Sequence, residues 1–528
     1  LHPKLAHRQG DPVSFFESLL VLVAVAVLLL QISRRIKAPY PTMLAAAGVC
    51  LALAPGAPTI SIEPHTALAL FLAPALVDAA FDFPIGEVRR LWRPLFALVV
   101  VAVLLSAGAV AWLGVAMAGL PIAAAVALGA IVAPPDAAAA TAVLSSVRMP
   151  RGSIAVLKGE SLLNDASALL LFSAALAFQA QGGIDQALAL KLGLAAPGGV
   201  ILGIVIAQVL RVLNPLVTGT LGGNLFEFVT AFGSWMIAER LGVSPVLCLV
   251  AFAMTVARTA ALRTPPRMRI HSFAVWTSAV FLLNVVAFLL MGLQARTIVA
   301  GMDGDRLVEA MGFASAVVVC LIVVRMVWVL LYLRLAQSFP SLRGGYPSIS
   351  LRNGVLVGWC GMRGLVTLAT AFALPGDFPQ RDLLVLTAFA VVLATLVFQG
   401  LTLAPLIRLL GLDREDGLTD ELVRLRADLA DAALAALDGK AGEAVDHWRY
   451  RFAAVLSRSA PSGSASATGP LEARRRVGLK ALRRQRVRLE ELRGDGAVSA
   501  DAFLVLQEEL DFEEISISRE DERQIEES

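Results

Sequence analysis

Long apolar runs follow one another from Ser14 to about Leu410, and they constrain the fold of this chain more than any other feature. Apolar residues make up 57% of the sequence and charged residues 16%, whereas a soluble domain carries about 25% charged residues. A helix of about 20 apolar residues can cross a bilayer with all its backbone hydrogen bonds satisfied. The sequence therefore predicts an all-α polytopic membrane protein.

Hydropathy divides the apolar region into about 13 predicted transmembrane helices. They lie near residues 14–33, 41–56, 65–82, 94–118, 121–146, 155–180, 187–213, 221–240, 243–258, 272–294, 307–335, 350–375 and 382–410. Arg and Lys gather in alternate loops, such as those around Arg34, Arg89 and Arg148. Because basic loops stay in the cytoplasm, we expect a multi-pass protein of the cell membrane with its N-terminus outside and its C-terminus in the cytoplasm.

The chain divides into three predicted parts. Residues 1–13 form a short external N-terminus without the layout of a cleaved signal peptide, residues 14–410 the transmembrane domain, and residues 411–528 a charged cytosolic tail. The tail is expected to be helical, with a basic stretch at Leu471–Arg493 and an acidic one at Ala500–Ser528. Two interpretations stay open: a solvated helical hairpin whose opposite charges attract, or a tail that regulates, stabilises a dimer or touches anionic lipid. The sequence does not indicate a partner for the tail.

Polar residues interrupt the sixth predicted helix between Gly159 and Asp165. A charge at mid-bilayer costs about 2.5–3.5 kcal/mol even on the mildest scales, so a carboxylate is kept there mainly for function. Glu160 and Asp165 point in different directions from a helix, so one can pair with another helix while the other binds a substrate. Desolvation disfavours a bare charge, so Asp165 can hold either a proton or a small cation. The alternative is an aspartate that only hydrogen-bonds a neighbouring helix.

Two other predicted helices contain breaks. In the fifth, Pro134 and Pro135 remove two amide donors directly before Asp136, which favours a discontinuous helix over a simple proline kink. In the twelfth, Gly361 and Gly364 surround an arginine. Paired breaks in two parts of a transporter point to a binding site near the middle of the membrane.

Four further polar residues lie deep in apolar sequence. Arg363, between the glycines of the twelfth helix, either places a positive charge at the C-terminal end of a half-helix or only anchors packing. Arg325 needs a buried anion, for which Glu160 is our first choice; otherwise it reaches the membrane surface along its aliphatic stem. Asp78 either lines an ion path or bridges helices, and Asn284 is either a ligand or an interhelical hydrogen-bonding residue.

These segments resemble the signature of the monovalent cation/proton antiporter family, in its electroneutral sodium/proton exchanger branch of bacterial type. The resemblance spans roughly residues 14–410, and its most specific part is the segment Gly159–Ala166. It implies a fold of about 13 helices with inverted repeats, a core domain with two crossing discontinuous helices, and a separate dimerisation domain. A homodimer is expected from the resemblance alone.

The resemblance also implies roles for individual residues. Asp165 would bind the proton and the cation, as the ligand of Na⁺, with Asn164 beside it, and Asp136 and Ser161 would complete the ion site. An Asn-Asp pair resembles that of members that exchange one ion for one proton. The chain departs from the family at Pro135, where relatives commonly carry a threonine, so a side-chain oxygen is missing.

By the same resemblance, Glu160 and Arg325 would form a structural ion pair, Asp78 would lie on the ion path, and Asn284 stands where some relatives carry a glutamate. We therefore predict a secondary antiporter, not an enzyme, that exchanges Na⁺, or Li⁺ or K⁺, for H⁺. A cation channel or an ion sensor with the same fold is the alternative. Membrane lipid and a second copy of the chain are the expected partners, and the sequence indicates no organic cofactor and no nucleic acid.

Overall fold

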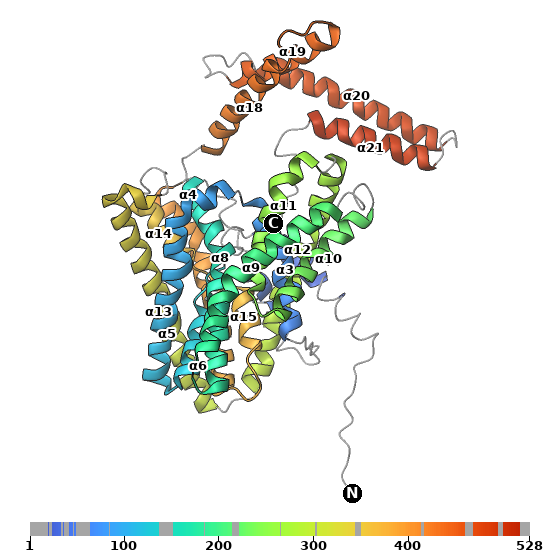
Figure 1. Cartoon of the computed structure of the whole chain (residues 1–528). Helices are drawn as coiled ribbons and strands as arrows, with labels where there is room; N and C mark the ends of the chain where they lie inside the picture. The colour runs from blue at the N-terminus through green and yellow to red at the C-terminus, as the bar shows by residue number, and fades with distance from the viewer. Residues whose placement is uncertain are drawn as a thin grey trace. The chain divides into compact units, whose positions relative to one another are not determined.

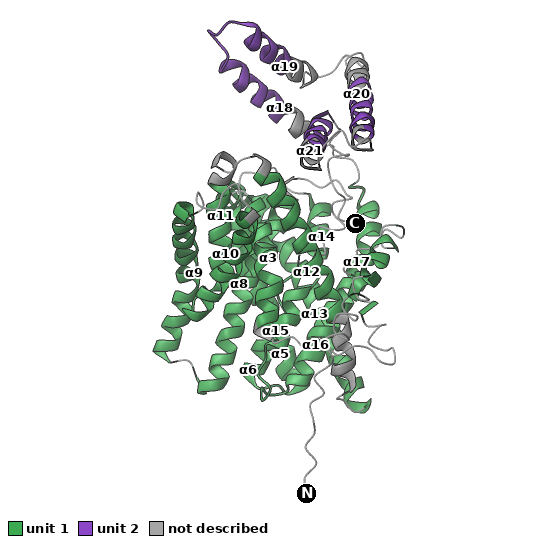
Figure 2. Cartoon of the chain, turned by 90° about the vertical axis from the view of Figure 1, so that its right-hand side faces the viewer, with its two compact units in different colours: residues 1–415, 528 green, residues 416–527 purple. Residues whose placement is uncertain are grey.

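The computed structural model is a set of packed helices (Figure 1). It describes residues 20, 24–32, 35, 42–45, 47–48, 64–83, 85–136, 151–183, 185–213, 221–263, 266–300, 304–343, 350–412, 417–459, 468–494 and 500–517. Every regular element within these ranges is a helix, which confirms the predicted all-α class. The chain divides into two compact units, residues 1–415 with Ser528 and residues 416–527 (Figure 2).

The first unit contains the apolar part of the chain. Its helices are α3 (Pro64–Asp82), α4 (Ile85–Phe96), η1 (Ala97–Ala102), α5 (Val103–Ala118), α6 (Ile122–Val132), α8 (Arg151–Gln181), α9 (Gln186–Leu213), α10 (Leu221–Arg240), α11 (Pro245–Arg263), α12 (Pro266–Ala300), α13 (Gly304–Ser338), η3 (Pro340–Arg343), α14 (Leu351–Trp359), α15 (Leu365–Phe372), α16 (Arg381–Ala394), η4 (Thr395–Gln399) and α17 (Gly400–Leu410).

Six of the described helical stretches are long and apolar enough to cross a membrane. They are Gly86–Ala118, Ser153–Gln181, Gln186–Leu213, Met268–Leu290, Gly304–Ser338 and Arg381–Leu410. Each overlaps one of the predicted transmembrane helices, in the predicted order. Half of the first predicted helix, near residues 14–33, and most of the second, near 41–56, lie outside the described residues; the described residues of both are helical.

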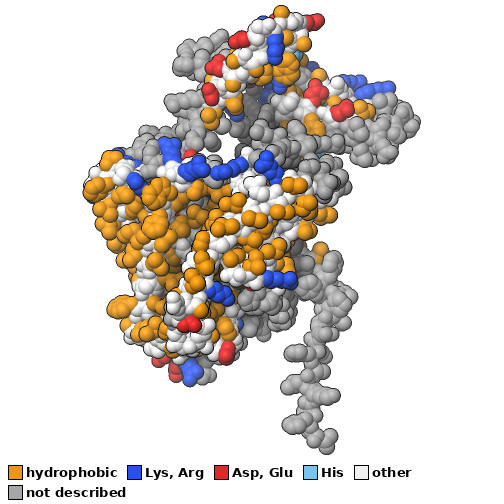
Figure 3. Space-filling model, viewed as in Figure 1, with side chains coloured by type: hydrophobic (Ala, Val, Ile, Leu, Met, Phe, Trp, Pro, Cys, Tyr) orange, Lys and Arg blue, Asp and Glu red, His pale blue; other side chains and the backbone are white. Residues whose placement is uncertain are grey.

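Small residues bring helices of the first unit close together. A Cβ atom at Gly203 of α9 would overlap the carbonyl group of Cys248 in α11, and one at Gly129 of α6 would overlap that of Ala107 in α5. Close backbone approach of this kind is typical of helices in membranes. Apolar side chains such as Ile201 are exposed to the outside. Figure 3 shows hydrophobic side chains over the flanks of the unit, whereas Lys and Arg gather along its upper edge. This distribution fits a bilayer around the first unit.

Helix α6 lies in the hydrophobic core and ends at a break. Nine of its eleven residues are buried, and it packs against α5, α8, α15 and α16. The helix stops at Val132 with Ala133 as its C-cap, and residues 134–136 follow without regular secondary structure. The next residues, 137–150, lie outside the described part of the chain. A second break separates α14 from α15 and leaves Cys360–Gly364 unwound.

Two π-helical turns, η1 and η4, interrupt long helices of the first unit, and η4 contacts the second break through Thr395. A π-turn adds a residue to the turn and is frequent at functional sites. The indole Nε1 of Trp328 donates to the carbonyl oxygen of Ala97 in η1 at 2.9 Å. The hydroxyl of Thr42 donates to the carbonyl oxygen of Leu396 in η4 at 2.7 Å. Contacts from other helices therefore hold both turns in place.

The second unit consists of two helical pairs, α18 with α19 and α20 with α21 (Figure 2). Their bounds are Gly417–Ala435, Glu443–Ser459, Thr468–Gly494 and Ala500–Ile517. Leu482 and Leu489 of α20 are buried. Arg486 of α20 donates to the carboxylates of Asp511 and Glu514 in α21, each at 2.6 Å. The basic and acidic stretches thus form a helical hairpin with ion pairs between its two arms.

Candidate functional site

The two breaks contact each other in the core of the first unit. The backbone N–H of Asp136, after α6, donates to the carbonyl oxygen of Met362, between α14 and α15, at 2.7 Å. A Cβ atom at Gly364 would overlap the carboxylate of Asp136, so only glycine fits this position without displacing the acid. Residues more than 220 positions apart in the sequence therefore meet where both helices are interrupted.

Arg363 joins the same two breaks through its side chain. Its guanidinium donates to the carbonyl oxygens of Val132 and Ala133, at 3.0 and 3.2 Å, and to that of Gly361. The first two are carbonyl groups at the C-terminal end of α6, where the helix dipole is negative. Arg363 is only 1% exposed, and its backbone N–H donates to the hydroxyl of Thr395 in η4 at 3.0 Å. The arginine therefore places its guanidinium at a helix end and connects the end of α6, the second break and η4 through hydrogen bonds.

Helix α8 supplies the amide that holds the first break. Asn164 is fully buried, and its Nδ2 donates to the carbonyl oxygen of Pro135 at 2.6 Å. Its Oδ1 has no hydrogen-bond partner within the described residues. Asp165, the next residue, is 7% exposed and lies close enough to Asp136 for the two carboxylates to repel each other when both are charged.

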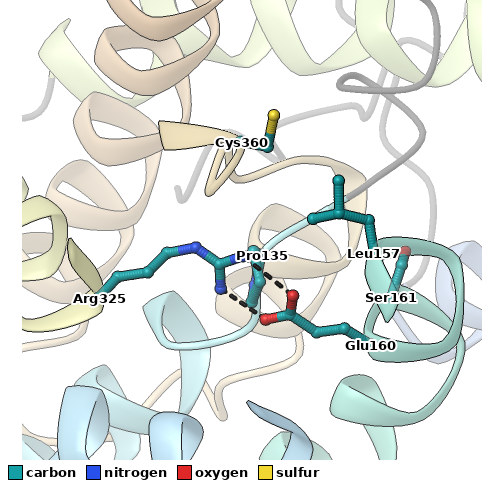
Figure 4. A pocket seen from close by; sticks show the side chains of 6 residues that line it. All are labelled: Pro135, Leu157, Glu160, Ser161, Arg325 and Cys360. Carbon is teal, nitrogen blue, oxygen red and sulfur yellow. Dashed lines mark hydrogen bonds and ion pairs between the residues drawn. The ribbon is translucent and has the colours of Figure 1, made fainter. Parts of the chain in front are cut away.

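Glu160 and Arg325 form a bidentate ion pair in the core (Figure 4). The Nη1 and Nη2 atoms of Arg325 donate to the two carboxylate oxygens at 2.5 and 2.9 Å, and Nη2 also donates to the carbonyl oxygen of Val357 at 3.3 Å. Arg325 is 3% exposed, so its guanidinium ends inside the protein and not at the membrane surface. Two parallel hydrogen bonds in a dry site give such a pair a fixed geometry.

A small pocket lies beside this ion pair (Figure 4). Its lining consists of Pro135, Leu157, Glu160, Ser161, Arg325 and Cys360. Ser161 and Asp165 are separated by one turn of α8 and share a face, as do Glu160 and Asn164. One face of α8 therefore anchors neighbouring segments through Glu160 and Asn164, while Ser161 and Asp165 lie on the face next to it.

Asp78 and Asn284 lie on helices that border this centre. Asp78 is on α3 and Asn284 on α12, and both residues are half-buried. The two helices pack against each other and against α15, which begins at the second break. The predicted ion-path residues are thus carried by neighbouring helices, whereas Asp136, Asn164 and Asp165 come together directly at the breaks.

The sequence reasoning missed several polar residues of the core. Thr395 and Gln399 of η4 are one π-turn apart; Gln399 is 1% exposed and neither atom of its amide is hydrogen-bonded in the part of the chain that the structure describes. Glu227 of α10 accepts a hydrogen bond from the hydroxyl of Ser272 in α12. The available signal was the same as for Asp165, namely a polar residue inside an apolar helix.

Comparisons with known proteins agree on one family. A family model described as "Sodium/hydrogen exchanger, transmembrane" matches residues 20–409. An uncharacterized Na(+)/H(+) exchanger of Mycobacterium tuberculosis is 30% identical over 525 residues, covering 94% of this chain and 95% of that protein. A sodium, potassium, lithium and rubidium/H(+) antiporter of Bacillus pumilus is 29% identical over 387 residues, covering 69% of this chain and 57% of that protein.

Among solved structures, the sodium proton antiporter MjNhaP1 from Methanocaldococcus jannaschii at pH 8 has a similar fold. The TM-score is 0.55 at 16% sequence identity, and the match covers 74% of this chain and 100% of that one. At this identity the likeness concerns the arrangement of the helices.

Proposed function

Because the chain belongs to the sodium/hydrogen exchanger family, we propose that it exchanges Na⁺ for H⁺ across the membrane, one for one, at Asp165. The observation that carries this proposal is the position of that carboxylate. Asp165 is buried beside Asp136 and directly follows Asn164, whose amide holds the break after α6. A carboxylate next to an interrupted helix meets free carbonyl groups and helix ends, which can bind ions where hydrocarbon cannot.

Exchange then follows from competition for one carboxylate. A bare charge is disfavoured in a buried site, and a proton or a Na⁺ ion can neutralise Asp165, but not both at once. Asn164 beside it carries no charge at any pH, so it adds no second proton to the cycle. In this proposal Asp136 stays charged and is balanced by the fixed charge of Arg363. The protein then moves the same charge in both directions, and the exchange is electroneutral.

In this proposal four residues would supply the oxygen ligands of a hard cation. The ligands would be the carboxylates of Asp165 and Asp136, the hydroxyl of Ser161 and the Oδ1 of Asn164, which has no hydrogen-bond partner within the described residues. Pro135 offers no side-chain oxygen, and its carbonyl already accepts from Asn164. Fewer ligands give weaker discrimination by size, so we propose that Li⁺ and K⁺ are also exchanged. The Bacillus pumilus relative is named for sodium, potassium, lithium and rubidium, which supports broad selectivity.

We further propose the family's architecture for this chain: about 13 helices in inverted repeats, with the two breaks belonging to discontinuous helices that cross. The hydrogen bond from Asp136 to Met362 supports a crossing at the breaks. Asp78 and Asn284 would line the ion path. The row of Lys and Arg along one edge of the first unit supports an N-terminus outside and a C-terminus in the cytoplasm of the cell (Figure 3). The working form would be a homodimer whose core carries Asp165 between the two sides.

The experiment that tests this function uses purified protein in liposomes that contain a pH-sensitive dye. With the voltage clamped, we expect an outward or inward Na⁺ gradient to drive H⁺ in the opposite direction, independently of the voltage. Asp165→Asn should abolish this flux, because an amide can neither release a proton nor neutralise Na⁺. The matched control is Asp377→Asn, which makes the same change at an exposed position and should leave the flux intact.

Two outcomes would contradict the proposal. Proton-coupled Na⁺ flux in a folded Asp165→Asn protein would remove that carboxylate from the mechanism. Voltage-driven cation flux without a pH change would instead support a cation channel with the antiporter fold. A response to K⁺ and not to Na⁺ would keep the mechanism and change the ion.

A further inference from the structure

One face of helix α20 in the second unit is strongly basic and exposed. Its members are Arg476, Lys480, Arg483, Arg484 and Arg488, and we call them the basic stripe. Arg476, Lys480, Arg484 and Arg488 recur every four positions, and Arg483 follows Lys480 by three, so all five lie along one side of the helix. The stripe faces away from α21, because the opposite side of α20 carries the buried Leu482 and Leu489 and the ion-paired Arg486. Blue side chains of α20 are visible in Figure 3.

Among the side chains that the structure describes, no carboxylate of α21 forms an ion pair with this stripe. Asp511 and Glu514 of α21 bind Arg486, which lies between the two arms of the hairpin. Within the described residues, Arg488 of the stripe forms an ion pair with Glu491, at 2.9 Å. Arg476 with Lys480, and Lys480 with Arg484, are like-charge pairs one helical turn apart, and such pairs destabilise a helix. An anionic partner would offset this repulsion.

Two exposed valines make the stripe suited to a membrane surface. Val477 and Val487 are 69% and 44% exposed and lie on the same side of α20 as the basic residues. A helix face that mixes arginine, lysine and exposed aliphatic groups can rest on a bilayer, with its charges among the phosphates and its apolar groups just below them. A soluble polyanion would engage the charges alone.

A short connecting segment also tethers the second unit to the membrane-spanning one. Helix α17 ends at Leu410 and α18 begins at Gly417. Seven residues of fully extended chain span at most about 25 Å, so the second unit is tethered near the bilayer that holds the first. Tethering raises the effective concentration of one partner at the other, and weak contacts become sufficient for binding.

We propose that the basic stripe of α20 docks on the headgroups of anionic phospholipids in the membrane that anchors the protein. The proposal rests on the membrane anchoring of the first unit and does not require the exchange reaction. The ligand chemistry is a surface of lipid phosphates, at which several arginine and lysine side chains bind together. Such binding weakens with salt, because the charges lie at the aqueous surface.

The test measures cleavage by trypsin, which must take an exposed Arg or Lys side chain into its own pocket. Full-length protein is placed in nanodiscs of neutral phosphatidylcholine or of the same lipid with about 30% phosphatidylglycerol, and the cut at each site is followed by mass spectrometry. In anionic nanodiscs we expect cleavage in the stripe to be at least about tenfold slower at low salt, and this protection to vanish at about 0.5 M salt.

Two triple variants, each of which removes three positive charges, distinguish binding by the stripe from an effect of the tail's net charge. Lys480→Gln, Arg483→Gln and Arg484→Gln together should remove lipid protection at the remaining sites, Arg476 and Arg488. Because the triple change removes repulsion within the helix, it should not unfold α20, and circular dichroism would check this. The control is Arg426→Gln, Lys440→Gln and Arg451→Gln, exposed residues of the α18–α19 pair, which should keep the protection.

Three results would overturn the proposal. Equal protection in neutral nanodiscs would mean that protein, and not lipid charge, covers the stripe. Loss of protection in the control variant would assign the effect to net charge. Inorganic polyphosphate that protects the stripe in neutral nanodiscs as strongly as phosphatidylglycerol does would favour a soluble polyanion over the bilayer. Exchange activity, measured on the same protein reconstituted in liposomes, is a separate readout, so failure of one proposal does not decide the other.

Discussion

Two buried arginines, Arg325 and Arg363, stand close to the candidate ion site and have their charges balanced in different ways. Arg325 binds the carboxylate of Glu160 through two hydrogen bonds, so the pair is neutral as a whole. The guanidinium of Arg363 binds backbone carbonyl groups of Val132, Ala133 and Gly361. A helix end offers only about half an elementary charge, so these carbonyl groups balance Arg363 incompletely.

This difference suggests different tasks for the two residues. A neutral pair fixes α8 against α13 and contributes no field to its surroundings beyond short range. An arginine on a helix end keeps part of its charge, in contact with the segment that leads to Asp136. We infer that Arg325 maintains the fold and that Arg363 sets the charge of the ion site. The predictions below test this distinction.

Arg325→Ala should give the largest loss of stability. It leaves the carboxylate of Glu160 buried without a partner, a loss of about 3–5 kcal/mol. The melting temperature of the detergent-solubilised protein should fall sharply, and the yield with it. Arg89→Ala, which removes an exposed arginine, should melt like the parent protein.

A double variant tests whether the two residues act as a pair. Glu160→Gln with Arg325→Met removes both charges, so it should melt higher than Arg325→Ala alone. If the double variant melts no higher than the single one, Glu160 and Arg325 are not energetic partners despite their contact.

Arg363→Ala should lower the stability less than Arg325→Ala does, but it should reduce exchange more. Its carbonyl partners lose their donors, but no carboxylate among the described residues loses a hydrogen-bonded partner, so the expected loss is about 1–3 kcal/mol. The exchange of Na⁺ for H⁺ should nevertheless fall below detection, because the positive charge at the end of α6, which balances Asp136 in the proposed mechanism, is gone. Arg363→Lys keeps the charge without the planar fork, so it should retain part of the flux with a changed apparent affinity for Na⁺. Full flux in Arg363→Ala would refute the functional role.

Two glycines of the second break allow the two roles to be compared by Gly→Ala substitutions, each of which adds one methyl group. A Cβ atom at Gly361 would overlap the side chain of Arg325, and one at Gly364 would overlap the carboxylate of Asp136. Gly361→Ala should therefore destabilise the protein by about 1–3 kcal/mol, as overpacking typically does, and lower its melting temperature. Gly364→Ala should lower the exchange rate. Gly233→Ala is the control, since a Cβ atom there meets nothing within 4 Å. Equal effects of both substitutions on both measurements would erase the distinction.

Much of this arrangement followed from the sequence because it depends on local chemistry. Two prolines predict an end to α6, and the glycines on either side of Arg363 predict the second unwound segment. The choice of Glu160 for Arg325 needed only the rule that a buried cation finds a buried anion. In each case the residue type itself limits the backbone conformation or the partner that is possible in apolar surroundings.

What the sequence did not predict depends on tertiary contacts. Nothing local to Arg363 says that its guanidinium reaches the end of α6, and Pro135 alone does not reveal that its carbonyl accepts from Asn164. Thr395 supports Arg363 from a π-turn, whose extra residue leaves no clear mark in the sequence. Such contacts are set by how distant helices pack, and hydropathy carries no information on that.

The smallest effect is expected for a third arginine, Arg486, which forms ion pairs in the second unit. Its side chain is 33% exposed, and it binds Asp511 and Glu514 across the α20–α21 hairpin. Its hydrogen bond to Asp511 raises the pKa of Arg486 further above its usual range, so the arginine stays charged at every working pH. Because water and salt screen exposed pairs, Arg486→Ala should cost only about 0.2–1 kcal/mol.

Hydrogen exchange of the backbone amides in α20 and α21 would measure this change in the full-length protein. Exchange should rise slightly in these two helices, less so at high salt, and the exchange of Na⁺ for H⁺ should stay unchanged. A loss of stability as large as that of Arg325→Ala would mean that burial is not what separates the arginines, and that the hairpin depends on its charges as strongly as the core does.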